Sequence, residues 1–183
     1  MAKNVLVPIA DGSEDIETAS IVDVLSRAGA TVTVASVCAL QITASNGLKL
    51  IADQLISECV NNSYDLIVLP GGMPGAEHLR DSKELVKMLK RQQEEGKLYA
   101  AICASPFVVL HHHGLLADRK ATAYPGFAEQ LENSDSIDSR VVVDKNCITS
   151  RGPGTAVEFA LKLVEELYGE QKAKEIAEAM LVI

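Results

Sequence analysis

The chain has 183 residues, of which 48% are hydrophobic and 23% charged, and it carries a formal net charge of −8. This size and composition are typical of one globular domain, here expected over residues 1–183. The acidic balance, with a pI of about 5.0, argues against a broad nucleic-acid surface and against anionic membranes. No run reaches the ~18 continuous apolar residues that a membrane span needs.

The chain opens with a strand pattern followed by a helical pattern. Residues 4–10 predict a buried strand, and residues 14–28 predict a helix that ends at a capping glycine, Gly29. The apolar stripe predicted for this helix consists of Ile16, Ala19, Val22 and Leu25. Residues 30–37 predict the second strand.

A hairpin and a further strand come next. Asn46-Gly47 lies between two short runs within residues 41–51, which is the strongest short signal of a β-hairpin. Residues 64–70 predict a buried strand that leads into the glycine-rich loop GGMPGAE, and residues 82–95 predict a charged, exposed helix.

The second half of the chain repeats this alternation, except over the less regular residues 118–140. Its predicted elements are a strand over 97–103, a helix over 105–113, a hairpin over 141–150, and helices over 152–169 and 170–180. Strands that alternate with helices predict an α/β fold, with a mainly parallel twisted sheet and helices on both faces.

In such a sheet, ligands bind outside the carboxyl ends of the strands. Four segments follow predicted strands directly and are rich in glycine, small residues or charge. They are residues 11–17, 71–75, 103–105 and 150–155. We therefore expect these four loops to meet in one crevice.

Cys103 lies where a predicted strand turns into a predicted helix, among small residues that leave its sulfur approachable. Unpaired N–H groups at a helix start lower the pKa of a thiol to roughly 3.5–7.5, which predicts a reactive cysteine. The alternative is a buried core cysteine. Cys38, Cys59 and Cys147 lack such a junction and are predicted to be packing residues.

The remaining cysteine and histidine patterns point away from metal chemistry. The four cysteines form no CxxC pair and fit no zinc-finger spacing, and the N-terminal apolar run is too short for a secretory signal. We expect reduced thiols in a cytoplasmic protein with no metal. His111, His112 and His113 favour a helix C-terminus, and His78 favours a surface position near the glycine-rich loop.

Carboxylates accompany the first predicted helix. Glu14 and Glu17 are three residues apart and share a helix face. Glu14 or Asp15 is also explained by the preference for acids at the start of a helix, and Glu14 could form a capping box with Asp11. Glu17 lies deeper. Beside a thiolate it is expected to keep its proton and to donate a hydrogen bond to the sulfur.

Backbone and cation candidates complete the predicted site. Gly71 and Gly72 expose backbone N–H groups that, with that of Ala104, could form an oxyanion hole. Arg151 could hold a small anion or form an ion pair with an acidic neighbour. The chain lacks the glycine patterns that bind dinucleotides or ATP, so no cofactor is expected.

Four motifs in order, GSEDIE (12–17), VLPGG (68–72), AAICASP (100–106) and TSRGPGT (149–155), resemble the ThiJ/PfpI superfamily, closest to its DJ-one branch. The resemblance implies a flavodoxin-like three-layer sandwich and a homodimer. It implies Cys103 as the reactive cysteine, Glu17 as its protonated partner, and the backbone of Gly72 and Ala104 as the lining of the thiol pocket.

The resemblance also implies activities. These are cofactor-free glyoxalase or deglycase action on glyoxal and methylglyoxal or their early adducts on proteins and nucleotides, and a role as a redox-responsive chaperone under oxidative stress. Ala104 replaces the histidine of the protease-like branch, which argues against peptidase activity. Tyr124 replaces a histidine of many relatives and is a weaker proton shuttle, and Asn46 replaces an arginine that some carry near the dimer contact.

Three functions follow from these residues. The first is an enzyme in which Cys103 attacks a dicarbonyl and Glu17 moves the proton. The second is a redox sensor whose Cys103 is oxidised to sulfinate with little turnover. The third is a flavodoxin-like module that binds a nucleotide or flavin, for which no phosphate-binding loop is present.

Overall fold

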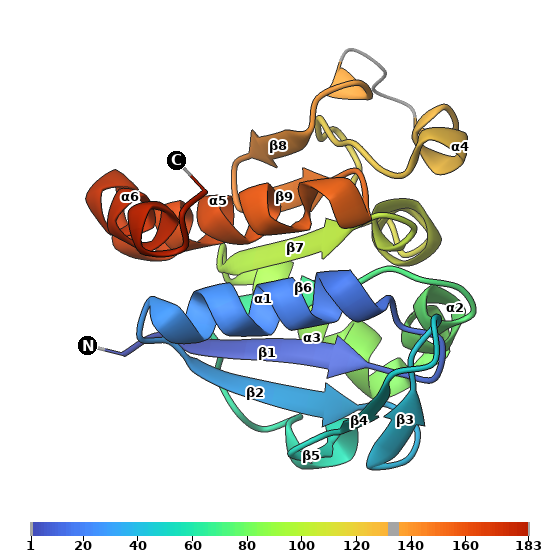
Figure 1. Cartoon of the computed structure of the whole chain (residues 1–183). Helices are drawn as coiled ribbons and strands as arrows, with labels where there is room; N and C mark the ends of the chain where they lie inside the picture. The colour runs from blue at the N-terminus through green and yellow to red at the C-terminus, as the bar shows by residue number, and fades with distance from the viewer. Residues whose placement is uncertain (1, 132–135, 183) are drawn as a thin grey trace.

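The computed structural model describes residues 2–131 and 136–182 and contains a seven-stranded twisted sheet (Figure 1). The strand order is β5-β2-β1-β6-β7-β9-β8, and every pair is parallel except β8 with β9. The strands are β1 Asn4–Ile9, β2 Thr31–Ser36, β5 Gln54–Leu55, β6 Leu66–Leu69, β7 Leu98–Ile102, β8 Val141–Asp144 and β9 Cys147–Ser150. The order of the main parallel strands is that of flavodoxin-like folds.

Helices cover both faces of the sheet, as the sequence predicted. One face carries α1 Asp15–Arg27, α5 Ala156–Tyr168 and α6 Glu170–Ala179. The other carries α2 Gly75–Asp81, α3 Lys83–Glu94 and the π-helix η2 Pro106–His111. Shorter helices are α4 Pro125–Ala128 and the 3₁₀ turns η1 Ile56–Glu58 and η4 Pro153–Thr155. The three-layer α/β sandwich is confirmed.

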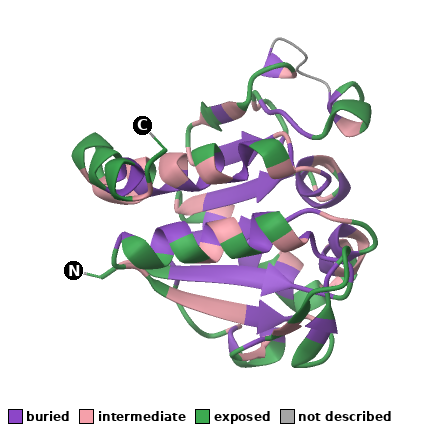
Figure 2. Cartoon of the chain, in the orientation of Figure 1, coloured by how far each residue is buried: buried purple, intermediate pink, exposed green. Residues whose placement is uncertain are grey.

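The core lies in two layers because successive side chains of a strand point to opposite faces. In β1, Leu6 packs toward α2 and α3, whereas Val5, Val7 and Ile9 pack toward α1 and α5. The central strands are therefore buried on both faces, as Figure 2 shows, which explains their continuous apolar sequences. Among the helices of the described residues, none has the length and apolarity of a membrane span.

The predicted hairpin is confirmed as β3 Gln41–Thr43 paired antiparallel with β4 Lys49–Ile51. Gly47 adopts a φ of +97°, which the turn requires. The carboxylate of Asp15, at the start of α1, accepts hydrogen bonds from the backbone N–H groups of Asn46 (2.8 Å) and Leu48 (3.1 Å). The turn is thus held against the first turn of α1.

The predicted apolar stripe of α1 is wrong at two of its four positions, because Ile16 is 56% exposed and Ala19 is exposed. Leu25 lies in the core, and the half-buried Val22 packs against it. The buried face instead contains Glu17, Thr18, Ile21, Val24 and Leu25. An acidic residue interrupts the true core face, so the apolar pattern by itself pointed to the neighbouring face.

Further local predictions need correction. Helix α2 was not predicted, because the glycines and Pro74 before it indicated a loop through residue 77. Helix α3 is only half exposed, since Leu85, Met88, Leu89 and Gln92 are buried. The helix predicted over residues 105–113 is a six-residue π-helix, η2. β5 and η1 were also not predicted, being only two and three residues long.

Candidate active site

The carboxyl ends of β1, β6, β7 and β9 bring the four predicted loops together. The N–H of Glu14 donates to the carbonyl of Gly71 (3.0 Å), and the N–H of Gly71 donates to Oε2 of Glu17 (2.7 Å). The N–H of Cys103 donates to the carbonyl of Ser150 (3.0 Å). Strands β1 and β6 lie side by side although they are not consecutive in the chain, and this switch point is where such folds bind ligands.

Cys103 sits directly after β7 with a φ of +65°, a conformation that few residues other than glycine adopt. It is partly exposed, whereas Cys59 and Cys147 are buried in the core as predicted. Cys38 is exposed, so the prediction of a packing residue is wrong there. Such backbone strain persists only where the surrounding structure holds it, and it concentrates at functional sites. The tight turn predicted from the small residues around Cys103 is therefore present.

Gly71 is required by the close approach of three segments. A Cβ atom at this position would lie 2.6 Å from the Cβ of Cys103 and 2.9 Å from Oε2 of Glu17. Gly72 adopts a φ of +86°, and a side chain there would meet the backbone of Gly12 and Glu14. The glycines that follow β6 thus make room for the thiol and the carboxyl to be neighbours.

Glu17 is a fully buried acid on α1. Its Oε2 accepts the hydrogen bond from Gly71, whereas Oε1 is buried and has no hydrogen-bond partner within the described part of the chain. Burial, assisted by the nearby charge of Glu14, raises the pKa of Glu17 to about 7, although the N–H of Gly71 acts in the opposite direction. Near neutral pH this side chain can therefore accept or release a proton.

The lowered thiol pKa predicted for Cys103 is not what the structure gives. Burial, followed by the charge of Glu17, raises the pKa of Cys103 to about 12, while hydrogen bonds from the N–H groups of Gly72 and Ala104 act to lower it. The prediction relied on a helix dipole, but η2 has six residues and begins only at Pro106. Desolvation and a neighbouring carboxylate outweigh so short a helix.

The two groups have to be considered as one titrating pair, because they perturb each other's ionisation. Below about pH 7 the pair holds two protons and is neutral. Between about pH 7 and about pH 12 it holds one proton and one negative charge. In that range, moving the remaining proton onto Glu17 produces a thiolate without changing the net charge of the site.

Glu14 performs the structural role that was left open for it. It is the N-cap of α1, and its Oε2 accepts a hydrogen bond from the N–H of Glu17 (2.7 Å). Glu14 caps the helix itself, and the carboxylate of Asp11 instead accepts from the N–H of Thr43. Glu14 thereby fixes the backbone of Glu17 and contributes a nearby negative charge.

Tyr124 and Arg151 lie at the edge of the site. The N–H of Tyr124 donates to the carbonyl of Cys103 (2.8 Å), and its half-exposed ring lies next to Gly152, 3.3 Å from where a Cβ would be. Arg151 forms an ion pair with Asp138 (3.7 Å) and donates to the carbonyl of that residue. For Arg151 the ion-pair alternative is the one observed.

The histidines make structural contacts. Nδ1 of His78 is 3.0 Å from the carbonyl of Asp11, and Nε2 of His113 is 2.8 Å from the carbonyl of Arg80. His111 stacks on Phe107 with ring centroids 5.1 Å apart. Within residues 2–131 and 136–182, no group of three histidine, cysteine or acidic side chains has the arrangement of a metal site.

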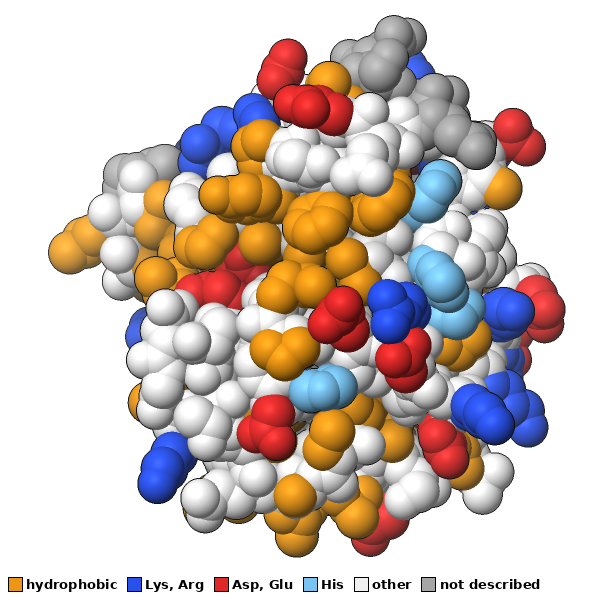
Figure 3. All heavy atoms as spheres, turned by 90° about the vertical axis from the view of Figure 1, so that its right-hand side faces the viewer, with side chains coloured by type: hydrophobic (Ala, Val, Ile, Leu, Met, Phe, Trp, Pro, Cys, Tyr) orange, Lys and Arg blue, Asp and Glu red, His pale blue; other side chains and the backbone are white. Residues whose placement is uncertain are grey.

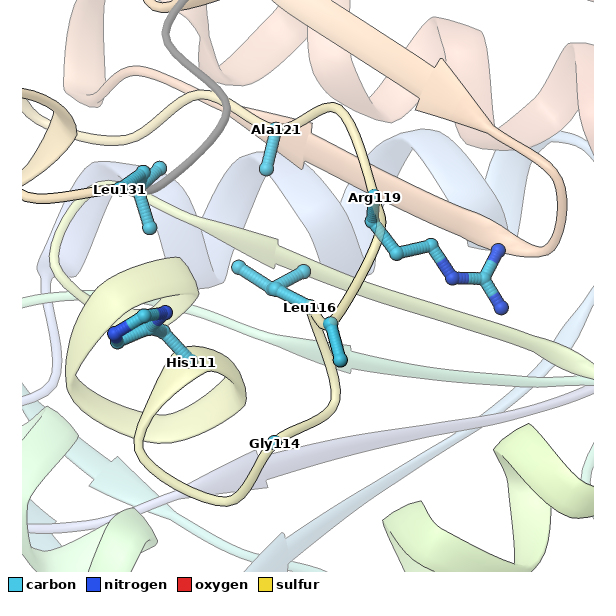
Figure 4. Close-up of a pocket in the computed structure, with 7 residues that line it drawn as sticks. His111, Gly114, Leu116, Arg119, Ala121 and Leu131 are labelled. Atoms are coloured by element: carbon cyan, nitrogen blue, oxygen red, sulfur yellow. The ribbon is translucent and has the colours of Figure 1, made fainter.

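A separate small cavity of about 120 Å³ lies beside η2 and contains none of the predicted site residues (Figure 4). It is lined by His111, Gly114, Leu116, Ala117, Arg119, Ala121 and Leu131.

One positioning residue was not identified from the sequence. Ser105 is fully buried, and its hydroxyl donates to the carbonyl of Pro70 at 2.5 Å. This bond ties the turn at Cys103 to the loop that carries Gly71 and Gly72. A serine among alanines in an otherwise apolar turn was the available signal, since a buried hydroxyl needs a partner.

The chain is similar to known proteins in sequence and in structure. A sequence model of the DJ-1/PfpI family matches residues 3–166. The chain is 54% identical to Protein DJ-1 homolog B of Arabidopsis thaliana over 179 residues, which are 97% of this chain and 41% of the plant protein. The chain spans less than half the length of the two plant relatives it matches.

Two other relatives match over nearly their whole length. The chain is 36% identical over 173 residues to Glutathione-independent glyoxalase DJR-1.2 of Caenorhabditis elegans, covering 94% of this chain and 91% of the nematode protein. The solved structure of oxidized DJ-1 from Toxoplasma gondii is 52% identical, with a TM-score of 0.96 and 98% of each chain covered.

Proposed function

The chain belongs to the DJ-1/PfpI family, and we propose that it is a cofactor-independent enzyme that acts on small dicarbonyls such as methylglyoxal and glyoxal, with Cys103 as the nucleophile. A relative named as a glutathione-independent glyoxalase supports this class of reaction. The observation that carries the proposal is the Cys103 thiol held beside the buried carboxyl of Glu17, across a glycine that leaves no side chain between them.

The first step is addition of sulfur to the aldehyde carbon. Glu17 takes the thiol proton as the carbon–sulfur bond forms, and the carbonyl π electrons move onto oxygen. The N–H groups of Gly72 and Ala104, which already face the sulfur, stabilise this oxyanion. Glu17 then returns the proton to the oxygen, giving a neutral hemithioacetal.

The second step converts the hemithioacetal to product. With methylglyoxal, the Glu17 carboxylate removes the hydrogen on C1 as a proton, an enediol forms, and the proton is delivered to C2. The result is a thioester of lactate on Cys103. Attack by water at the thioester carbon releases lactate and regenerates the thiol, so the net reaction is methylglyoxal plus water to lactate. Early adducts of these dicarbonyls on protein or nucleotide amines are the second substrate class.

The test compares two cysteine variants with the unchanged protein. Cys103→Ala should abolish lactate formation from methylglyoxal, measured by a lactate-specific enzymatic assay. Cys38→Ala is the matched control, because Cys38 is exposed and lies outside the site, and it should keep full activity. Equal activity in the two variants would rule out Cys103 as the nucleophile, and no lactate from the unchanged protein would rule out this reaction.

A second candidate, a redox sensor with a chaperone role, is favoured by one observation. Oε1 of Glu17 is buried without a hydrogen-bond partner in the described residues, so its proton is available to an oxygen added to the Cys103 sulfur. The similar solved structure from Toxoplasma gondii is of the oxidized protein. After mild peroxide, peptide mass spectrometry should find two added oxygens on Cys103 before Cys38 changes; the reverse order would refute this role.

We also propose that the protein is a homodimer through the exposed face of α1 and the hairpin. Ile16 on α1 is 56% exposed, and Ile51 on the hairpin is 76% exposed. The hairpin also carries the exposed Leu48, and exposed apolar patches of this kind mark interaction surfaces. Ile51→Asp should shift sedimentation equilibrium from dimer to monomer, whereas Val143→Asp on β8 should not. A monomeric unchanged protein would refute the proposal.

A further inference from the structure

Two exposed apolar residues, Met73 and Tyr124, adjoin the backbone around Cys103, and the proposed reaction uses neither; we call the surface that they contribute the mouth of the site. Met73 follows Gly72 directly and is 43% exposed, and Tyr124, whose N–H is bonded to the carbonyl of Cys103, is 50% exposed. The two residues come from different loops, after β6 and before α4. The N–H of Gly72, the residue before Met73, contacts the Cys103 sulfur, whereas Tyr124 is bonded to the backbone of Cys103 itself.

These side chains belong to a wider apolar surface. Pro74 and Pro125 follow Met73 and Tyr124 in the chain and are both exposed. Phe127 is half-buried and stacks on Phe107 with ring centroids 5.7 Å apart. Figure 3 shows hydrophobic side chains gathered across this end of the molecule, which is the carboxyl end of the sheet.

The charges near the mouth disfavour anions. The Cys103–Glu17 pair carries one negative charge above about pH 7, and Glu14 lies beside it. The guanidinium of Arg151, on the loop after β9, is paired with Asp138. A phosphate or carboxylate on the substrate would therefore meet a like charge at the site, whereas a neutral apolar group would not.

We infer that this mouth selects neutral 2-oxoaldehydes that carry an apolar side chain, an aromatic ring in particular, and that Tyr124 and Met73 bind that side chain. The inference rests on the proposed function for the reaction itself, and it defines the substrate class. Within the second proposed substrate class, nucleotide adducts carry phosphate and are therefore poorer substrates than neutral adducts. Covering roughly 60 Å² of a ring corresponds to about a tenfold preference over a substrate without one.

The first experiment measures the mouth without requiring turnover. Three reagents that alkylate thiols are compared. Iodoacetamide carries a small neutral amide next to the reacting carbon, N-benzyliodoacetamide adds an aromatic ring, and iodoacetate carries a negative carboxylate. Rate constants at Cys103 are measured by intact mass in a Cys38→Ala protein and divided by those of N-acetylcysteine. The benzyl reagent should be favoured by about tenfold over iodoacetamide, and iodoacetate should be the slowest.

Variants then assign the preference to its residues. Tyr124→Ala and Met73→Ala should each lower the ratio of benzyl reagent to iodoacetamide toward that of N-acetylcysteine. Tyr124→Phe should keep it, because the ring and not the hydroxyl makes the contact. Val143→Ala is the matched control, since Val143 is 40% exposed on β8, and it should leave the ratio unchanged.

Two results would overturn the inference: a normalised ratio near one in the unchanged protein, or a ratio that Tyr124→Ala leaves intact while circular dichroism shows the variant folded. Turnover provides the second measurement. The kcat/KM for phenylglyoxal should exceed that for glyoxal, and Tyr124→Ala should remove the difference. Selective labelling without turnover of any dicarbonyl would refute the proposed enzyme and still support the selectivity of the mouth.

Discussion

The pKa of Glu17 predicts an unusual dependence of stability on pH. Burial raises this pKa from 4.5 to about 7, so the folded protein binds the proton more tightly than the unfolded chain does. The resulting stabilisation is fully present below pH 4.5 and is lost as the pH rises through 7. Glu17→Gln removes the titrating group while keeping an oxygen that can accept the hydrogen bond from Gly71.

The magnitude follows from the two pKa values. Relative to the fully protonated state, ionisation of the carboxyl lowers the free energy of unfolding by roughly 1 kcal/mol at about pH 5.5 and by roughly 3 kcal/mol at about pH 8. Between these two pH values, the unchanged protein should therefore lose about 2 kcal/mol that the Gln variant does not lose. The two proteins are compared by how steeply their free energy of unfolding changes with pH. The Gln variant buries an amide N–H₂ in place of the unpartnered Oε1, and the cost of burying that group does not depend on pH.

The assay is urea unfolding in reducing buffer at the two pH values, followed by circular dichroism. Glu166→Gln is the control, because it removes a carboxylate from the exposed surface of α5 and should reproduce the pH slope of the unchanged protein. Equal slopes for the Glu17→Gln variant and the unchanged protein would show that Glu17 is already ionised at low pH. The reasoning about the titrating pair would then be wrong.

Three further outcomes are expected. The kcat/KM for methylglyoxal should rise with pH through about 7, where Glu17 loses its proton and becomes able to accept that of the thiol; a flat profile from pH 5.5 to 8.5 would contradict this role. Gly71→Ala should lower the free energy of unfolding in urea by about 1–3 kcal/mol and remove most of the activity, because the added Cβ would meet Cys103. Gly154→Ala should leave both nearly unchanged, because no atom lies within 4 Å of the Cβ added there. Asp15→Ala should accelerate hydrogen exchange at the amides of Asn46 and Leu48 by roughly tenfold, since both lose their acceptor; unchanged protection would mean that the hairpin is held by other contacts.

Most of the architecture was predictable because its signals are local or follow from topology. The β-branched runs, the cap at Gly29 and the Asn46-Gly47 turn each specify a backbone conformation through nearby residues. The rule that parallel strands collect ligands at their carboxyl ends then brought Cys103, Glu17 and Gly71 together, although they are far apart in the chain. The sequence by itself therefore determined the fold class and the residues that meet in the site.

Only the tertiary structure decided how these residues behave. Which face of α1 is buried depends on packing against the sheet and α5, and this packing places Glu17 in the core and Ile16 in solvent. The partner of Arg151 is an aspartate thirteen residues earlier, which no spacing rule predicts. The direction of the thiol pKa depends on how much water the fold removes from Cys103, and desolvation is a property of the assembled loops rather than of any short segment.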